Sequence, residues 1–183
     1  PRPRRTILLG LWGGEEQGIN GSRRFAADHP EVVAGLQALL NQDTGTGRVS
    51  RISAQGLLHA GDHLDRWLAR VPDEITRHIE LAAPDLPSAG SSDHAAFICA
   101  GAPAFHLTSV DWGYGLHTWH TNRDTFDKIV LEEVRSNAVL IAMLAYLASE
   151  DPDRVPRDRR ELPPGPQGQA PQWPTCQPGQ AAW

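Results

Sequence analysis

Two neighbouring carboxylates, Glu15 and Glu16, are the residues of this sequence best suited to chemistry. They follow an apolar run at residues 6–12, which predicts a buried strand, and a pair of glycines. Folds of the α/β class bind ligands where strands end, and adjacent carboxylates repel each other there unless one binds a cation and the other holds a proton. The pair therefore indicates metal-assisted hydrolysis. The alternative is a solvated turn whose acids stabilise the start of a helix.

Three more motifs follow this pair in order. A second predicted strand at residues 36–41 is followed by Asp43. A Ser-Asp-His sequence ending in Asp93 and His94 opens a predicted helix, and His120 begins the sequence His-Thr-Asn-Arg-Asp-Thr ahead of the last helix. Each motif alone is common, but the four together are specific.

The four motifs in this order resemble the M28 family of zinc peptidases over roughly residues 6–149. The resemblance implies a three-layer α/β/α sandwich with a mixed, mostly parallel sheet, whose N-terminal part is missing here. It also implies an exopeptidase that hydrolyses peptide bonds with a water activated by two zinc ions.

The resemblance assigns roles to individual residues. Glu15 matches the general base, Glu16 and His120 match ligands of one zinc, and Asp43 matches a ligand of the other. Zinc binds imidazole nitrogen and carboxylate oxygen, and a catalytic zinc keeps one position open for water.

Four further residues are predicted to support the site, and each has a simpler alternative role. The motif predicts that Asp93 and His94 support the site from outside the ligand shell, or else only start a helix. Asp124 either orients the imidazole of His120 or caps the following turn. Tyr114 either replaces the tyrosine with which several family aminopeptidases steady the oxyanion, or is a loop aromatic.

The sequence also departs from the family. M28 sites need a His-x-Asp segment and a metal-bridging Asp ahead of the Glu-Glu strand, and no His or Asp precedes Glu15 here. We therefore expect an incomplete site and an inactive chain. Two alternatives remain open: a non-catalytic M28-like fragment or homologue, and a single-zinc acyl transferase resembling glutaminyl cyclase. Aminopeptidase and carboxypeptidase directions are not distinguished.

Composition limits the partners. The formal charge of -5 and the pI near 5.9 give no general attraction to nucleic acid, and no apolar stretch is long enough to span a membrane. A peptide substrate is the partner that the resemblance implies, with a secreted or periplasmic location. The apolar surroundings of Cys99 favour a buried thiol, and a disulfide to Cys176 remains open. The sequence gives no oligomeric state.

Alternating elements predict a sheet with helices on both faces. Two regions are expected, the C-terminal portion of a catalytic domain at residues 1–150 and an extended or disordered tail rich in Pro, Gln and Gly at residues 151–183. Ser92 is expected to cap the third helix, and His59, His63, His78 and His117 are expected at the surface or in loops. The predicted helices are residues 21–28, 60–71, 93–100 and 130–148, and the further strands are residues 48–53, 75–81 and 104–108.

Overall fold

A four-stranded sheet forms the centre of the computed structural model, which describes residues 2–88, 90, 92–165, 168–170 and 172–179. The strand order is β1-β4-β2-β3. The β1–β4 and β2–β3 pairs are parallel and the β2–β4 pair is antiparallel, which confirms the mixed, mostly parallel sheet. The strands are β1 (Leu39–Gln42), β2 (Val49–Ser53), β3 (Glu80–Ala82) and β4 (Ala104–Ser109).

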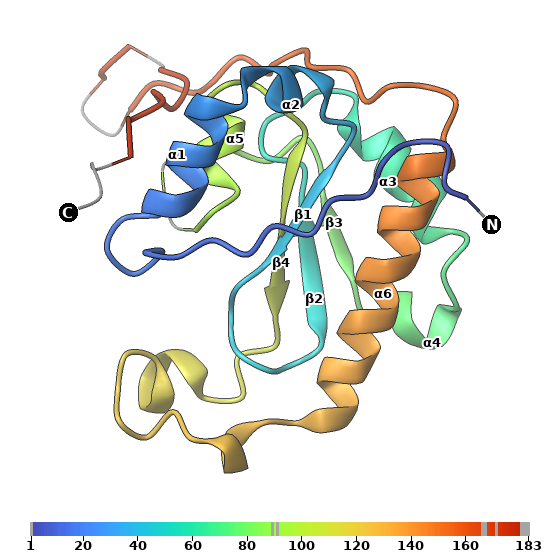
Figure 1. Cartoon of the computed structure of the whole chain (residues 1–183). Coiled ribbons are helices and arrows are strands. Elements are labelled where there is room, and N and C mark those ends of the chain that lie inside the picture. The colour runs from blue at the N-terminus through green and yellow to red at the C-terminus, as the bar shows by residue number, and fades with distance from the viewer. Residues whose placement is uncertain (1, 89, 91, 166–167, 171, 180–183) are drawn as a thin grey trace.

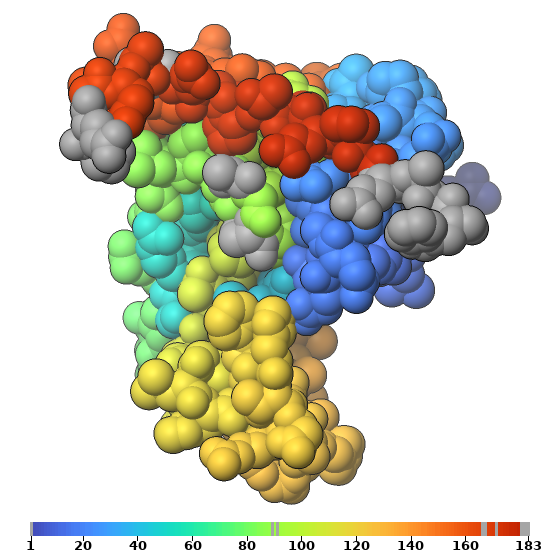
Figure 2. Space-filling model, turned by 90° about the vertical axis from the view of Figure 1, so that its left-hand side faces the viewer, coloured from blue at the N-terminus to red at the C-terminus, as the bar shows by residue number. Residues whose placement is uncertain are grey.

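Helices flank this sheet. Helices α1, α2 and α5 gather on one side of it, and α3, α4 and α6 on the other (Figure 1). The α-helices are α1 (Asn20–Asp28), α2 (Pro30–Gly35), α3 (Ala60–Leu68), α4 (Asp73–Thr76), α5 (Ala95–Ile98) and α6 (Leu131–Glu150). A π-helix, η1 (Tyr114–Thr118), and a 3-10 helix, η2 (Phe126–Lys128), lie in the connection between β4 and α6. This connection projects from the body of the molecule (Figure 2).

The core lies between the sheet and the helices. Phe97, Phe105, Leu107, Leu140 and Leu144 are almost wholly buried. Each such side chain contributes roughly 1.5–3 kcal/mol through removal of apolar surface from water. Helix α6 supplies two of them and contains no Gly or Pro over its 20 residues, which suits a long helix.

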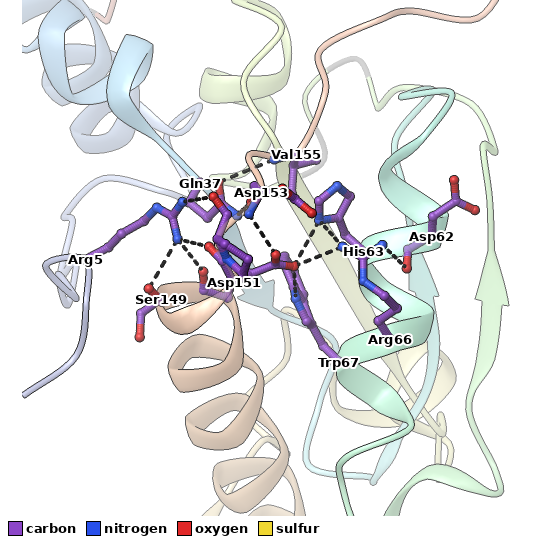
Figure 3. Close-up of polar contacts among 12 residues, drawn as sticks. Arg5, Gln37, Asp62, His63, Arg66, Trp67, Ser149, Asp151, Asp153 and Val155 are labelled. Carbon is purple, nitrogen blue, oxygen red and sulfur yellow. Dashed lines mark hydrogen bonds and ion pairs between the residues drawn. The ribbon is translucent and has the colours of Figure 1, made fainter. Parts of the chain in front are cut away.

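Arg5 caps the C-terminal end of α6. Its guanidinium group donates hydrogen bonds to the carbonyl oxygens of Ala148, Ser149, Asp151 and Pro152. A helix leaves its last carbonyls without partners, and a cation is stabilising there. The N-terminal segment is therefore fixed to the end of α6 (Figure 3).

The prediction of a buried strand at residues 6–12 is wrong for this structure. No described residue in this segment is in a strand, and Leu9 and Leu11 are each 86% exposed. A continuous apolar run becomes a strand when neighbouring strands pair with it and layers cover both faces. No strand of the described residues pairs with it. Trp12 does pack against Phe25 and Phe97, which anchors the end of the run.

His63 is buried, so its predicted surface position is also wrong; His59 and His78 are exposed, as expected. The carboxylate of Asp151 explains the burial, because it lies 3.2 Å from His63 Nδ1 and also accepts hydrogen bonds from Arg66 and Trp67 (Figure 3). Sequence spacing alone shows no link between α3 and a residue beyond α6.

A disulfide joins Cys99 to Cys176, so the prediction of a buried free thiol is wrong. Cys99 lies at the end of α5, and its Cα is 4.9 Å from that of Cys176. The remote cysteine becomes a partner because the segment after α6 returns across the molecule to α5 (Figures 1 and 2).

The segment after α6 makes several other contacts with the body. Val155 is buried, Leu57 forms an isolated antiparallel bridge with Arg159, and Trp173 Nε1 donates to the carbonyl of Ile98 at 2.9 Å. The guanidinium carbon of Arg159 lies 4.5 Å from the Trp173 ring centroid. Residues 166–167, 171 and 180–183 of the expected tail lie outside the described residues, and the domain boundary stays a prediction.

Candidate active site

The C-terminal ends of β1 and β4 define one edge of the sheet, and Asp43 directly follows β1 there. Glu15 and Glu16 lie in the turn ahead of α1. The carbonyl of Glu15 accepts hydrogen bonds from the backbone nitrogens of Gly18 and Ile19, at 2.9 and 2.7 Å, which fixes this turn. Gly14 within the turn has φ +73°, a conformation that glycine adopts without strain.

Glu16 and His120 contact each other. Their Oε2 and Nε2 atoms are 2.8 Å apart, and the two side chains are about half exposed. The structure therefore unites two residues that lie more than one hundred positions apart in the sequence and that the resemblance gives to the same zinc. His120 has φ +57°.

Glu15 lies among other carboxylates. Burial raises its pKa, and the charges of Asp43, Glu16 and Asp93 raise it further, while His120 partly opposes them. These charges act on Glu15 because the turn before α1, the residue after β1 and the start of the α5 region meet at the same edge. The structure thus places Glu16, Asp43, Asp93 and His120 within electrostatic range of Glu15.

Tyr114 lies beside the same group. Burial raises the pKa of its hydroxyl, as do the charges of Asp43, Asp124, Glu16 and Glu15. The ring passes so close to Gly45 that a Cβ there would lie 2.9 Å from Tyr114 Cγ, which explains why the loop after Asp43 carries a glycine. A neutral hydroxyl at this position can donate a hydrogen bond.

Asp93 and His94 lie next to the site, and His94 is buried. Burial raises the pKa of Asp93, and the charge of Asp43 adds to this, whereas a hydrogen bond with Ser22 opposes it. His94 is fully buried and stacks on His106, with ring centroids 4.5 Å apart. Burial and the neighbouring His106 lower the pKa of His94 to about 3, so its imidazole is neutral.

Ser92 does not cap α5, and that prediction is wrong. The N-cap residue is His94, with no side-chain capping hydrogen bond. The hydroxyl of Ser92 donates instead to Asp43 Oδ2 at 2.6 Å. The Ser92 hydroxyl therefore pairs with the Asp43 carboxylate and not with a backbone group at the start of α5.

Sequence reasoning missed Asn41, Ser92 as a partner of Asp43, and His106. Asn41 and His106 are paired in the register of β1 and β4. Asn41 lies two positions before Asp43, hence on the same face of the strand, and this polar position in an apolar strand was the available signal.

Asp124 and His117 are the remaining loop residues for which the sequence predicts a position or role. Asp124 makes no hydrogen bond with His120 in the described part of the chain, although its charge acts on Tyr114. His117 is exposed, as expected.

The donor types suit zinc, but their number does not. Glu16, His120 and Asp43 offer carboxylate oxygen and imidazole nitrogen. Among the described residues, however, no three His, Cys, Asp or Glu side chains are gathered so that they could hold a metal ion. This arrangement does not form a complete zinc site.

Comparison with known proteins decides the family. The sequence profile of peptidase family M28 matches residues 1–145 of the 183. The chain belongs to peptidase family M28. Carboxypeptidase Q of Rattus norvegicus is 24% identical over 156 residues, and that of Pongo abelii is 26% identical over 158. Each alignment covers 85% of this M28 chain and 32% of the relative, so the chain spans about a third of their length.

Solved structures support the M28 fold. A peptidase M28 precursor from Shewanella amazonensis superposes with a TM-score of 0.68 at 22% identity, covering 90% of this chain and 35% of that one. An aminopeptidase from an Aneurinibacillus species gives 0.55 at 22% identity, covering 83% and 35%. A glutaminyl cyclase from an Acidobacteriales bacterium gives 0.52 at 18% identity, covering 72% and 46%. Within the described residues, no helix is long and apolar enough to cross a membrane.

Proposed function

We propose that this M28 chain provides the general base and part of the ligand set of a metal-dependent exopeptidase. The observation that carries the proposal is that Glu16 Oε2 lies 2.8 Å from His120 Nε2, and that Glu16, Asp43 and His120 all lie near enough to Glu15 to act on its pKa. Family membership supports peptide-bond hydrolysis, and the Glu-Glu, Asp and His-Thr-x-x-Asp-Thr motifs assign the roles.

Glu15 would act on the proton of the attacking water. A base works best when its pKa lies near the working pH, and the environment of Glu15 moves its pKa upward in that direction. The protonated Glu15 could then return the proton to the leaving amine. The raised pKa of Tyr114 keeps its hydroxyl protonated, and it would donate to the developing oxyanion.

Two zinc ions in a complete site of this family would supply Lewis-acid activation. Glu16 and His120 are the proposed ligands of one ion, and Asp43 of the other, with the remaining ligands supplied by other residues. We further propose that the 183-residue chain alone binds zinc weakly and hydrolyses peptides at no useful rate. A secreted or periplasmic location is part of the proposal, since disulfides persist in oxidising compartments.

A non-catalytic member of the family is the second candidate. The absence of a three-donor group among the described residues favours it. A glutaminyl cyclase-like activity is the third candidate. The structural similarity to a glutaminyl cyclase supports it, whereas the match to the M28 family profile favours a peptidase.

The test has two parts. The purified chain is assayed with aminoacyl and C-terminal dipeptide substrates and with an N-terminal glutamine peptide, with added zinc and with a chelator. We expect no turnover; rapid, chelator-sensitive hydrolysis would overturn the proposed incompleteness. In a protein that joins this chain to the remaining ligands, Glu15→Gln should keep the metal content and cut kcat by about 10²–10⁴, whereas Glu16→Gln should lower the metal content. If neither variant changes turnover, the assigned roles are wrong.

A further inference from the structure

Four polar side chains form a hydrogen-bonded chain that ends on Asp43. Asn41 Nδ2 lies 2.8 Å from Ser92 Oγ and 3.3 Å from His94 Nδ1. Ser92 Oγ lies 2.6 Å from Asp43 Oδ2. Ser92 and His94 are 2% and 0% exposed, so water does not compete for their hydrogen bonds, whereas the Asp43 end of the chain is exposed.

The chemistry of the acceptors sets the direction of this chain. Ser92 has a single hydroxyl hydrogen, and it donates this hydrogen to Asp43 Oδ2. Ser92 can then only accept from Asn41, which places the two amide hydrogens of Asn41 on Ser92 Oγ and His94 Nδ1. With the Asn41 amide in this orientation, His94 Nδ1 accepts and the hydrogen of the neutral ring lies on Nε2, which has no hydrogen-bond partner among the described residues.

The sequence and the strand pairing hold the chain in place. Asn41 is on β1, two positions before Asp43, and its register partner on β4 is His106. His106 stacks on the His94 ring, with an angle of 8° between the ring planes. The stack fixes the plane of His94, and the Asn41 amide fixes which nitrogen carries the hydrogen.

We propose that Asn41 is a positioning residue: its amide donates to Ser92 Oγ, which leaves the Ser92 hydroxyl hydrogen for Asp43 and so holds the Asp43 carboxylate in one orientation at the site. The inference rests on the proposed role of Asp43. It assigns to Asn41 no contact with substrate.

The substitution Asn41→Asp tests the direction with almost no change in shape. The introduced carboxylate would only accept, so it would compete with Asp43 for the Ser92 hydroxyl and draw a hydrogen onto His94 Nδ1. Histidine ¹⁵N shifts report which ring nitrogen carries the hydrogen, and three-bond couplings to Cγ report the χ1 rotamers of Asp43. Both are measured on the 183-residue chain with no metal added.

The expected pattern separates this role from a purely structural one. The unmodified chain should show His94 with hydrogen on Nε2 and Asp43 in one rotamer. Asn41→Asp should move the hydrogen to Nδ1 and average the Asp43 rotamers. Ser92→Ala should average the Asp43 rotamers and leave His94 unchanged. Gln42→Leu is the matched control on β1, since Gln42 donates to Ser109 at 2.8 Å, and it should change neither signal.

The unmodified chain alone can overturn the inference. Hydrogen on His94 Nδ1 there would mean that Asn41 presents its oxygen and that the chain runs the other way. If Asn41→Asp does not fold, Ser92→Ala still tests the inference. A single Asp43 rotamer in that variant would reject the proposed role of Asn41. These readouts do not depend on hydrolysis, so they stand or fall separately from the proposed function.

Discussion

The carboxylate of Glu16 lies 2.8 Å from the imidazole of His120, which joins the turn before α1 to the loop after the π-helix. Both partners are about half exposed, and such pairs stabilise a fold by only about 0–1 kcal/mol. The contact therefore matters for the electrostatics of the site more than for the stability of the protein.

Replacing His120 by Ala should raise the pKa of Glu15. His120 opposes the shift that burial and the neighbouring acids impose on Glu15, and its removal leaves those effects unopposed. A ¹³C-detected titration of the Glu15 carboxyl measures this, with His117→Ala, an exposed histidine of the same loop, as the control. An unchanged or lower pKa of Glu15 in His120→Ala would contradict the arrangement.

Asp151→Asn should destabilise the protein by about 1.5–3 kcal/mol, because it weakens the hydrogen bonds that Arg66 and Trp67 donate to a buried carboxylate and alters its contact with His63. Asp65→Asn, an exposed position on α3, should change stability by less than about 0.5 kcal/mol. Urea unfolding at neutral pH measures both, and equal effects would count against the buried network.

The same carboxylate predicts a pH dependence. Burial works to raise the pKa of Asp151, but hydrogen bonds from Trp67, the backbone of Asp153, His63 and Arg66 together hold it below its ordinary value. A lowered folded-state pKa gives stability that is present above the unfolded pKa, near about 4, and is lost as pH falls through the folded value. The stability difference between the unmodified chain and Asp151→Asn should therefore shrink below about pH 4, and a difference that grows there would refute this.

Reduction should loosen the segment after α6. The Cys99–Cys176 disulfide spans 77 positions, and closing such a loop stabilises a fold by typically about 2–4 kcal/mol. Cys176→Ser should lower the unfolding midpoint and abolish its response to reductant. Thiol titration of the unreduced, unfolded protein gives the direct check, and two free thiols would show that the bond does not form.

Leu9→Asp and Leu11→Asp should each change the free energy of unfolding by less than about 0.5 kcal/mol, since both side chains are 86% exposed. Leu140→Ala, at a buried position of α6, should cost about 2–5 kcal/mol. A large loss of unfolding free energy in Leu9→Asp would show that residues 6–12 are buried, as the sequence predicts.

Local sequence determined many of the regular elements and the choice of candidate site residues, but the expected single strand at residues 75–81 is wrong, because this stretch divides between α4 (Asp73–Thr76) and β3 (Glu80–Ala82). The helix at Asn20–Asp28, the strand at Leu39–Gln42 and the long helix Leu131–Glu150 follow from periodicity and from helix-stopping residues. Glu15, Glu16, Asp43 and His120 are candidates because short motifs in a fixed order resemble those of the M28 family.

Tertiary structure decided whatever depends on a partner remote in the sequence. The apolar run at residues 6–12 is exposed because a strand requires neighbours. His63 is buried because its ring contacts the Asp151 carboxylate, and Cys99 is oxidised because Cys176 returns to α5. The hydroxyl of Ser92 donates to Asp43 and does not cap the helix, because the folded chain places Asp43 within hydrogen-bond distance of it. Asn41 lies next to the site because its amide donates to Ser92. Periodicity reports how a residue is placed within its own element, whereas these contacts depend on how distant elements pack.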